Sequence, residues 1–481
     1  MLALLVLSAT LSAPNHLCHT MERFPLPPKV ALADLPKTRQ ATKTERDAWG
    51  TYPNMITSTN FVLKWGDLGG VQQSHAQRLI NSFETAWQTE VVTMGYPAPA
   101  SAASYYFNVY IGSTGGTTPE ALQDGGYYYL DDAGYPMIVM STSVAADADM
   151  AESVPPHEFF HALEDESGSY SGYNDVGAWY WEASSEWAAA EVAPSNPYNA
   201  SFLFGYGLVP DYPVDVFDYP DTGAFLESHQ YGAFIFPRYL SEKVADRNLV
   251  RASWLNAGYQ QDPLIVIGNL LAAEGREIYQ TFAEFAAHNA TWDYSNGATY
   301  RQWVDGYAEY YPAWDHRIAA EVPSTGTGPA WAAPDQTTLP QRFGYNVVHM
   351  SAPIPGNLTA SFQGASTGPK GSNAVWKVII VKKYGNRREY VDLPLTGTVG
   401  ELVIPGVGTE SDLYLVAAVF APRAASLETF DFRYKLAYPV PEVTPPADGG
   451  DEDGGCHSVP PAPFTAGLLV LGWRCWRRRR R

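Results

Sequence analysis

The first third of the chain alternates short apolar runs with turn-forming residues, a pattern typical of β-strands. Residues 60–66 (NFVLKWG) and 105–112 (YYFNVYIG) are two such runs. Residues 127–141 predict a hairpin with an Asp-Ala-Gly turn at 132–134. Because Pro136 cannot donate a hydrogen bond, the second strand of this hairpin is expected at an edge of the sheet or at the end of a ladder.

Apolar residues recur at helical spacing in several longer stretches. In residues 74–92 they lie four apart on one face, which predicts an amphipathic helix. Ser74 with Gln77 forms a capping box at its start. Further helices are expected in the middle of the chain, at residues 177–192, 228–244, 262–275 and 276–292.

Beyond a stretch rich in Pro, Gly and Thr at residues 323–340, the pattern returns to short strands separated by turn signals. This pattern predicts an antiparallel β-sandwich over residues 335–440. The earlier strands followed by helices predict an α+β domain over residues 46–325. The six strands of the sandwich are expected at residues 345–351, 358–364, 376–383, 400–406, 413–421 and 430–438.

Both ends of the chain have the composition of targeting segments. Residues 1–13 are apolar and are followed by small residues, as in a secretory signal, although a positively charged start is missing. A buried N-terminal helix is the alternative. Residues 14–45 are Pro-rich and polar, which predicts a linker or pro-like segment. Residues 441–459 form an acidic Pro/Gly linker, and residues 460–481 hold a short apolar run and a cluster of arginines.

Charge and cysteine content narrow the classes of function. The formal net charge of −20 argues against a nucleic-acid partner, because such a partner requires a basic face. The cysteines are Cys18, Cys456 and Cys475, and none lies between residues 19 and 455. The folded body is therefore expected to lack disulfides, and a metal ion there is expected to have His, Asp or Glu ligands.

The stretch VPPHEFFHALED, residues 154–165, carries the clearest chemical pattern. His157 and His161 lie one helical turn apart, so both imidazoles can reach one ion, and Zn2+ suits such ligands. Glu158 is adjacent and can address a water on that ion. The two prolines before His157 fit the first turn of a helix. The alternative is an ordinary helix that carries two histidines.

A second stretch, WEASSEW, supplies carboxylates. Glu182 and Glu186 are one turn apart on a predicted helix rich in tryptophan. Such a helix is expected to be mostly buried, and a buried carboxylate needs a partner or a metal ion. The alternative is an exposed pair of acids on a solvated face.

These two blocks together resemble the gluzincin metallopeptidases, the thermolysin-like group, in their motifs and in the gap of about twenty residues between them. The likeness is nearer to a set of exported bacterial metallopeptidases with HEFFHA and a tryptophan-flanked EASSE block. It implies a zincin-like domain with Zn2+ bound by His157, His161 and Glu182, and with Glu158 as general base. Glu186 would hold a ligand imidazole, although the thermolysin type has Asp at this position.

The resemblance also implies a donor to the oxyanion, which in gluzincins is a Tyr or a His. His229 and Tyr231 in ESHQYGAF are both candidates, and Tyr231 is the preferred one. A packed aromatic residue is the alternative for this position. The strand at residues 135–141, if it lies at an edge, suits a peptide or protein substrate that binds by strand addition.

The C-terminal tail resembles the myxobacterial sorting signal known as MYXO-CTERM over residues 454–481, with Gly-Cys, a short apolar helix and an arginine cluster. This resemblance implies an exported protein anchored at the cell surface or outer membrane, with Cys456 as the processed residue. A nonspecific basic tail is the alternative.

The expected function is thus that of an exported, surface-anchored zinc metallopeptidase. Two alternatives remain open: an inactive binding or adhesion protein that works through its β-sandwich, and a zinc hydrolase of a non-peptide amide or ester. Asn174 and Asp175 offer oxygen ligands to a structural Ca2+, but their spacing does not require one. The oligomeric state is open.

Overall fold

The computed structural model of this protein describes residues 18, 20, 26, 28–29, 43–46, 52–122, 125–170, 176–217, 224–408, 412–425 and 427–439. These residues belong to one compact unit, Met1–Pro439. Several predicted features lie outside the described residues: the signal segment 1–13, the linker 441–459 with Cys456, the tail 460–481, and the calcium candidates Asn174 and Asp175.

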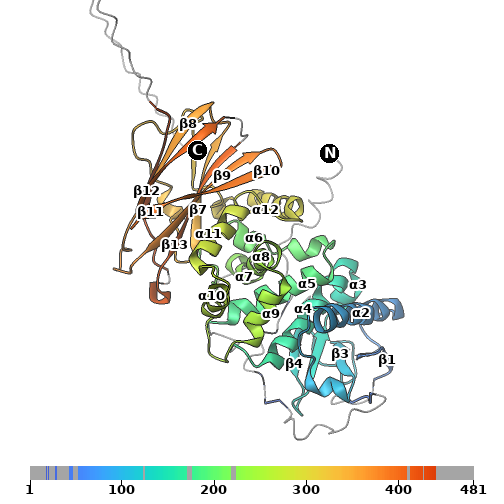
Figure 1. Ribbon diagram of the computed structural model, residues 1–481. Coiled ribbons are helices and arrows are strands. Elements are labelled where there is room, and N and C mark those ends of the chain that lie inside the picture. Colours follow the sequence, from blue (N-terminus) through green and yellow to red (C-terminus); the bar gives the residue numbers. More distant parts are fainter. Residues whose placement is uncertain are drawn as a thin grey trace, which may run out of the picture. The chain divides into compact units, whose positions relative to one another are not determined.

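The fold is α+β, and its first sheet is mixed. Its order is β1-β2-β3-β5-β4, with β2, β3 and β5 mutually parallel and the outer strands antiparallel to their neighbours. Helices α2 and α4 pack beside these strands (Figure 1). The strands are β1 Asn54–Thr57, β2 Phe61–Trp65, β3 Phe107–Ile111, β4 Gly126–Leu130 and β5 Pro136–Met140.

The predicted hairpin is confirmed as β4 and β5, but the prediction that its second strand forms an edge is wrong. Pro136 lies opposite Leu130 at the end of the ladder, as the other interpretation of this proline expected. The residues after Pro136 keep their N–H groups, and β5 pairs in parallel with β3 on its other side. Strand β4 is therefore the edge strand.

The predicted helix at residues 74–92 is confirmed as α2, Gln73–Ala86, followed by a π-helical stretch, Trp87–Thr93. Its capping box was predicted at the wrong residues. The helix begins one residue earlier, so Gln72 is the N-cap, and the ring of His75 accepts a hydrogen bond from the Gln72 backbone N–H at 3.5 Å. Ser74 consequently lies inside the first turn.

The HEFFH stretch lies on a longer helix than expected. Helix α4, Ala148–Ser167, is capped by Asp147, whose carboxylate accepts hydrogen bonds from two backbone N–H groups. Pro155 and Pro156 are therefore in the helix interior, and their predicted place in a first turn is wrong. A proline at 156 leaves the Glu152 carbonyl without its helical donor. The Ser82 hydroxyl on α2 donates to that carbonyl at 3.4 Å.

Helices continue to residue 310. The predicted helix at residues 228–244 is divided after Gly232, and α3, α6, α9 and α12 were not predicted. The remaining helices are α3 Thr142–Ala146, α5 Ala178–Val192, α6 Phe204–Gly207, α7 Ala224–Gly232, α8 Ile235–Tyr239, a π-helix at Leu240–Val244, α9 Arg247–Leu255, α10 Pro263–Ala273, α11 Ile278–Asn289 and α12 Gly297–Tyr310.

The last part of the chain forms two further sheets, of order β10-β9-β13-β7-β6 and β11-β12-β8-β14. All six predicted strands are present, and pairing is antiparallel except between β6 and β7. Strands β6, β10 and β11 were not predicted. The strands are β6 Ala320–Val322, β7 Gly344–Ser351, β8 Gly356–Gly364, β9 Val375–Tyr384, β10 Arg387–Leu393, β11 Leu395–Thr396, β12 Val399–Val407, β13 Asp412–Phe420 and β14 Phe432–Ala437.

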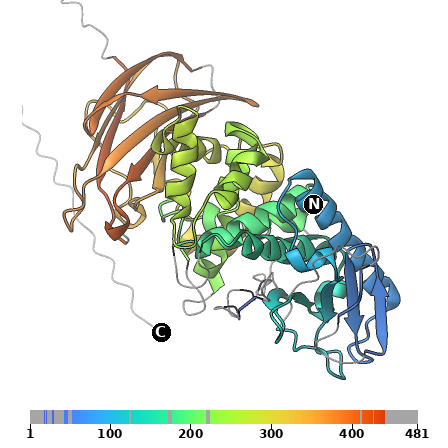
Figure 2. The same cartoon turned by 60° about the horizontal axis from the view of Figure 1, so that its bottom comes forward.

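The central strands of the sheet β10-β9-β13-β7-β6 contribute side chains to two hydrophobic cores. On β13, Leu415 and Ala417 join the core shared with the four-stranded sheet, whereas Val416 and Ala418 join the core that contains the helices. This alternation follows from the two-residue period of a strand. Helix α11 contacts β9 and β13 on the second face, and the helices meet this sheet in Figure 2.

None of the helices in the described part of the chain has the length and the apolar character needed to cross a bilayer.

Candidate metal centre

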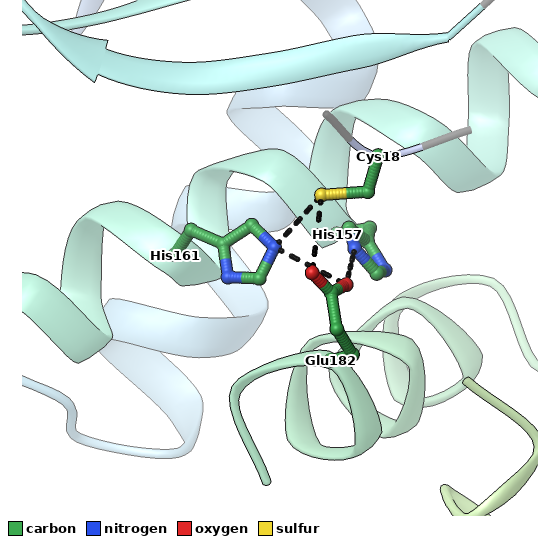
Figure 3. A group of neighbouring side chains, drawn as sticks. All are labelled: Cys18, His157, His161 and Glu182. Atoms are coloured by element: carbon green, nitrogen blue, oxygen red, sulfur yellow. Dashed lines mark hydrogen bonds and ion pairs between the residues drawn. The ribbon is translucent and has the colours of Figure 1, made fainter. Parts of the chain in front are cut away.

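Three of the predicted site residues converge between two buried helices. His157 and His161 lie one turn apart on α4, and Glu182 reaches them from α5, which packs against α4. Figure 3 shows the three side chains pointing toward one another. Glu182 Oε2 lies 3.2 Å from His157 Nε2 and 3.7 Å from His161 Nε2.

The opposite side of each imidazole ring is held by a carboxylate. His157 Nδ1 lies 3.1 Å from Glu186 Oε2, and His161 Nδ1 lies 2.7 Å from Glu164 Oε2. Such contacts orient each ring so that Nε2 faces the centre, and they raise the basicity of a ligand imidazole. The ring of Trp181 stacks on His161, with centroids 5.9 Å apart.

Glu164 was missed at the level of sequence. It lies three residues after His161, on the same face of α4, so helical periodicity could have identified it. Its carboxylate also accepts hydrogen bonds from the hydroxyls of Ser184 (2.7 Å) and Ser185 (3.2 Å) on α5. Glu164 thereby ties the two helices together behind the cluster.

Glu158 is fully buried beside the cluster and under the edge strand. Burial raises the pKa of its carboxyl above the ordinary value. One oxygen, Oε2, accepts a hydrogen bond from the Thr20 hydroxyl at 3.0 Å, and Oε1 has no hydrogen-bond partner among the described residues. Gly126 on β4 makes room for this side chain, since a Cβ there would lie 3.0 Å from Glu158 Cγ.

The charges in the cluster depend on one another. Burial alone would lower the pKa values of His157 and His161, but hydrogen bonds and charge from their partners raise both well above the ordinary value. Burial would raise the pKa of Glu182, but hydrogen bonds from the two histidines lower it to about 2. Protons on the histidines therefore balance an ionised carboxylate, and a divalent cation can replace those protons.

Cys18 and Thr20 also lie in this site, and this corrects the expectation that no cysteine reaches it. Cys18 Sγ is 3.2 Å from His161 Nε2 and 3.7 Å from Glu182 Oε1 (Figure 3). Burial raises the pKa of this thiol. Cys18 is 139 positions before His157 in the sequence, so no motif spacing could have connected the two.

The two candidates for the oxyanion donor are placed differently. The ring of Tyr231, on α7, lies 6.1 Å from that of His157, and its hydroxyl donates to the Cys18 carbonyl at 3.2 Å. His229 packs against Tyr206 with ring centroids 5.2 Å apart, and burial lowers its pKa to about 3. Within the described residues no hydrogen bond or ion pair joins His229 to the cluster, so only Tyr231 reaches the site.

The donor set suits a zinc ion. One ligand atom from each of Cys18, His157, His161 and Glu182 lies within 4.8 Å of the other three, and all four residues are buried. Two imidazoles, a carboxylate and a thiol are the ligand types that Zn2+ takes in tetrahedral sites. The adjacent cavity, lined by Ser153 and Tyr231 among others, is only about 10 Å³, room for at most one water molecule.

Comparison with known families places the chain without assigning an activity. Residues 28–440 match DUF6055, a family of unknown function. The match spans most of the 481 residues, and the chain therefore belongs to this family. No curated protein gives a significant match.

Similarities to solved structures are weak. One is the pre-peptidase C-terminal domain of a collagenase from Bacillus anthracis, with 12% identity, a TM-score of 0.16 and coverage of 25% of this chain and 94% of that one. Another is BtGH115A, a family GH115 4-O-methyl-α-glucuronidase with specificity for decorated arabinogalactans. It shows 10% identity, a TM-score of 0.16 and coverage of 72% of this chain and 53% of its own. Neither likeness bears on the activity of this protein.

Proposed function

We propose that this protein is a zinc-dependent metallopeptidase with His157, His161 and Glu182 as metal ligands. The observation that carries the proposal is the convergence of two His Nε2 atoms and a Glu182 oxygen, with a carboxylate on Nδ1 of each ring. Helix α4 also brings Glu158 to the same side. A chance pair of surface histidines would have neither the burial nor the second set of carboxylates.

A bound zinc ion would supply Lewis acidity and an activated water molecule. Glu158 would accept a proton from the attacking water and deliver it to the leaving amine. Its raised pKa brings the proton affinity of this carboxylate nearer to neutral pH, which suits both transfers. Tyr231 already donates a hydrogen bond to a backbone carbonyl beside the cluster, and the same donor would stabilise the oxygen of a scissile peptide.

The edge strand favours a peptide over a small amide or ester as substrate. Strand β4 pairs with β5 on one side, and Gly126 at its start lies against Glu158. An extended peptide that adds to the open side of β4 would lie across the general base. This role replaces the one first expected for the strand at residues 135–141.

The finer description of the fold belongs to the same proposal. We assign residues 46–325 to a zincin-like domain, on the basis of the mixed sheet with its antiparallel edge strand and the helix pair α4–α5. We assign residues 335–440 to a β-sandwich, because the two later sheets share one hydrophobic core. Export and surface anchoring rest on the sequences of residues 1–13 and 454–481.

Metal analysis of the purified protein tests the proposal. Elemental analysis is expected to find about one zinc per chain in the wild type and to find the zinc lost in Glu182→Ala, because Glu182 is one of the ligands. Glu152→Gln, an exposed glutamate on α4, is the matched control and should keep the metal.

The outcomes separate the three candidate functions. Zinc with cleavage of unfolded protein substrates supports a peptidase, whereas zinc with turnover of small amides or esters alone supports the non-peptide hydrolase. Absence of zinc from the wild type after reconstitution, with a correctly folded protein, would contradict the metal centre and favour a binding protein.

A further inference from the structure

The residues Cys18 and Thr20 lie along the edge strand β4, where a substrate is expected. Cys18 pairs with Gly126 in an isolated parallel bridge. The Tyr128 backbone N–H donates to the Thr20 hydroxyl at 2.8 Å. Cys18 and Thr20 thus lie against the open side of β4, where a peptide would bind by strand addition.

These two residues contact two of the proposed metal ligands, the proposed general base and Tyr231. The Cys18 thiol lies 3.2 Å from His161 Nε2, in the midst of the metal ligands. The Thr20 hydroxyl donates to Glu158 Oε2 at 3.0 Å. The Cys18 carbonyl accepts the hydrogen bond of Tyr231 at 3.2 Å. Cys18 and Thr20 therefore contact metal ligands, the general base and the oxyanion donor together.

We propose that Cys18 is the fourth ligand of the metal ion, and that the stretch carrying it is an internal inhibitor that keeps the site latent. The inference rests on the proposed metallopeptidase function. When the sulfur binds the ion, the thiol proton leaves to solvent. When the stretch leaves, the fourth position becomes free for water, as a catalytic zinc site requires.

The stretch is built as an inhibitor and not as a substrate. It presents a side-chain sulfur to the ligand atoms, so the position at which a scissile carbonyl would be polarised is taken by an atom that cannot be hydrolysed. It is also held outside the site. Lys29 Nζ pairs with Asp165 Oδ2 at 3.0 Å, and Leu26 packs against the main core.

The ligand assignment is tested by loading the full chain with Co2+ in place of zinc. A cysteine ligand gives a sulfur-to-cobalt charge-transfer absorption in the near ultraviolet, so the wild type should show this band. Cys18→Ala should bind the same amount of cobalt without the band. Cys456→Ala and Cys475→Ala are matched cysteine controls and should keep it.

Latency is tested by hydrolysis of an unfolded protein substrate by the same full-length chains loaded with zinc. A tethered segment has an effective concentration on the order of millimolar, so its release is expected to raise kcat/KM at least about tenfold in Cys18→Ala. Thr20→Val removes the hydrogen bond to Glu158 but leaves the sulfur, so it should keep the cobalt band and show a smaller gain in activity.

The results distinguish this inference from the function on which it rests. Stoichiometric cobalt without a charge-transfer band in the wild type, or a band that survives in Cys18→Ala, would overturn the cysteine ligand and leave the metal centre intact. Equal activity of Cys18→Ala and wild type would overturn latency alone. Failure of both chains to bind any metal would overturn the metal centre itself, and the inhibitor with it.

Discussion

The helix pair α4–α5 buries many ionisable side chains, whereas the strands β7 to β14 bury almost none. The two helices bury six ionisable side chains between them, namely His157, Glu158, His161, Glu164, Glu182 and Glu186. On the strands β7 to β14, by contrast, Lys382 is the one charged residue among the buried side chains of the described residues. Apolar side chains are buried on both faces of the sheet β10-β9-β13-β7-β6.

This difference separates chemistry from stability within one compact unit. Each buried ionised group costs several kcal/mol unless partners or a metal ion compensate it. Between α4 and α5 this cost is offset, because the ionisable side chains pair with one another and, in our proposal, bind a cation. The sheets gain stability from apolar burial, so substitutions there should change the free energy of unfolding and leave the chemistry of each folded molecule unchanged.

The largest effect is expected from Glu158→Gln. The amide cannot accept the proton of the attacking water, so kcat/KM should fall by about 10³-fold or more, while the metal content stays the same. Kinetics and elemental analysis on the Cys18→Ala background measure both. Glu152→Gln is the control on the same helix, and unchanged turnover in Glu158→Gln would remove this residue from the role of base.

In the sheets, Phe362→Ala on β8 is expected to lower stability and to leave the metal centre unchanged. This ring is fully buried against Trp376 and Phe432, with centroids 5.3 Å and 5.4 Å away. Its loss should lower the free energy of unfolding by about 4 kcal/mol. Urea denaturation measures the change, and Val403→Ala on β12, which is exposed, should change it by less than about 0.5 kcal/mol.

The zinc content per folded Phe362→Ala chain should equal that of the wild type. If the metal were lost from the folded variant, the separation of chemistry from stability would be incorrect.

A smaller effect is expected from Glu164→Gln, which tests whether the carboxylates that contact Nδ1 of the ligand imidazoles contribute to the affinity for zinc. The substitution weakens the partner of His161 Nδ1 without removing a ligand, so the affinity for zinc should fall by about 10- to 100-fold. Competition with a chromogenic chelator measures this affinity. Glu186→Gln should act in the same way through His157, and an unchanged affinity in both would show that the carboxylates serve packing alone.

The smallest effect is expected where the helices join the sheets, at His316. A hydrogen bond from its ring to Asp211 (2.9 Å) raises the pKa of His316. Because the folded pKa lies above the unfolded value of about 6.5, this stabilisation is complete below that pH and is lost as pH rises through the folded pKa. The half-buried ring limits it to below about 1 kcal/mol.

Urea denaturation at several pH values on both sides of the folded pKa measures this dependence. His316→Gln and Asp211→Asn should both abolish it. Persistence of the same slope in either variant would assign the dependence to other groups.

Much of the local structure was predictable, because it follows from short-range periodicity. The spacing of His157 and His161 places both on one face of any helix, and the continuous apolar run of residues 413–421 produced a strand with two apolar faces. The predictions were wrong where one sequence pattern is compatible with two structures. Pro136 was compatible with an edge or with a ladder end, and Pro156 lies inside α4, where Ser82 on another helix donates to the carbonyl that this proline leaves without its helical donor.

By itself, the sequence determined the chemical types at the site and the helical spacing that groups them in pairs, since the geometry of a single helix decides both. Only the tertiary structure decided that α5 faces α4, that β4 is the edge strand, that Tyr231 and not His229 reaches the cluster, and that Cys18 lies among the ligands. These contacts join residues up to 213 positions apart. Their formation depends on which apolar faces pack together, and no local pattern in the chain contains that information.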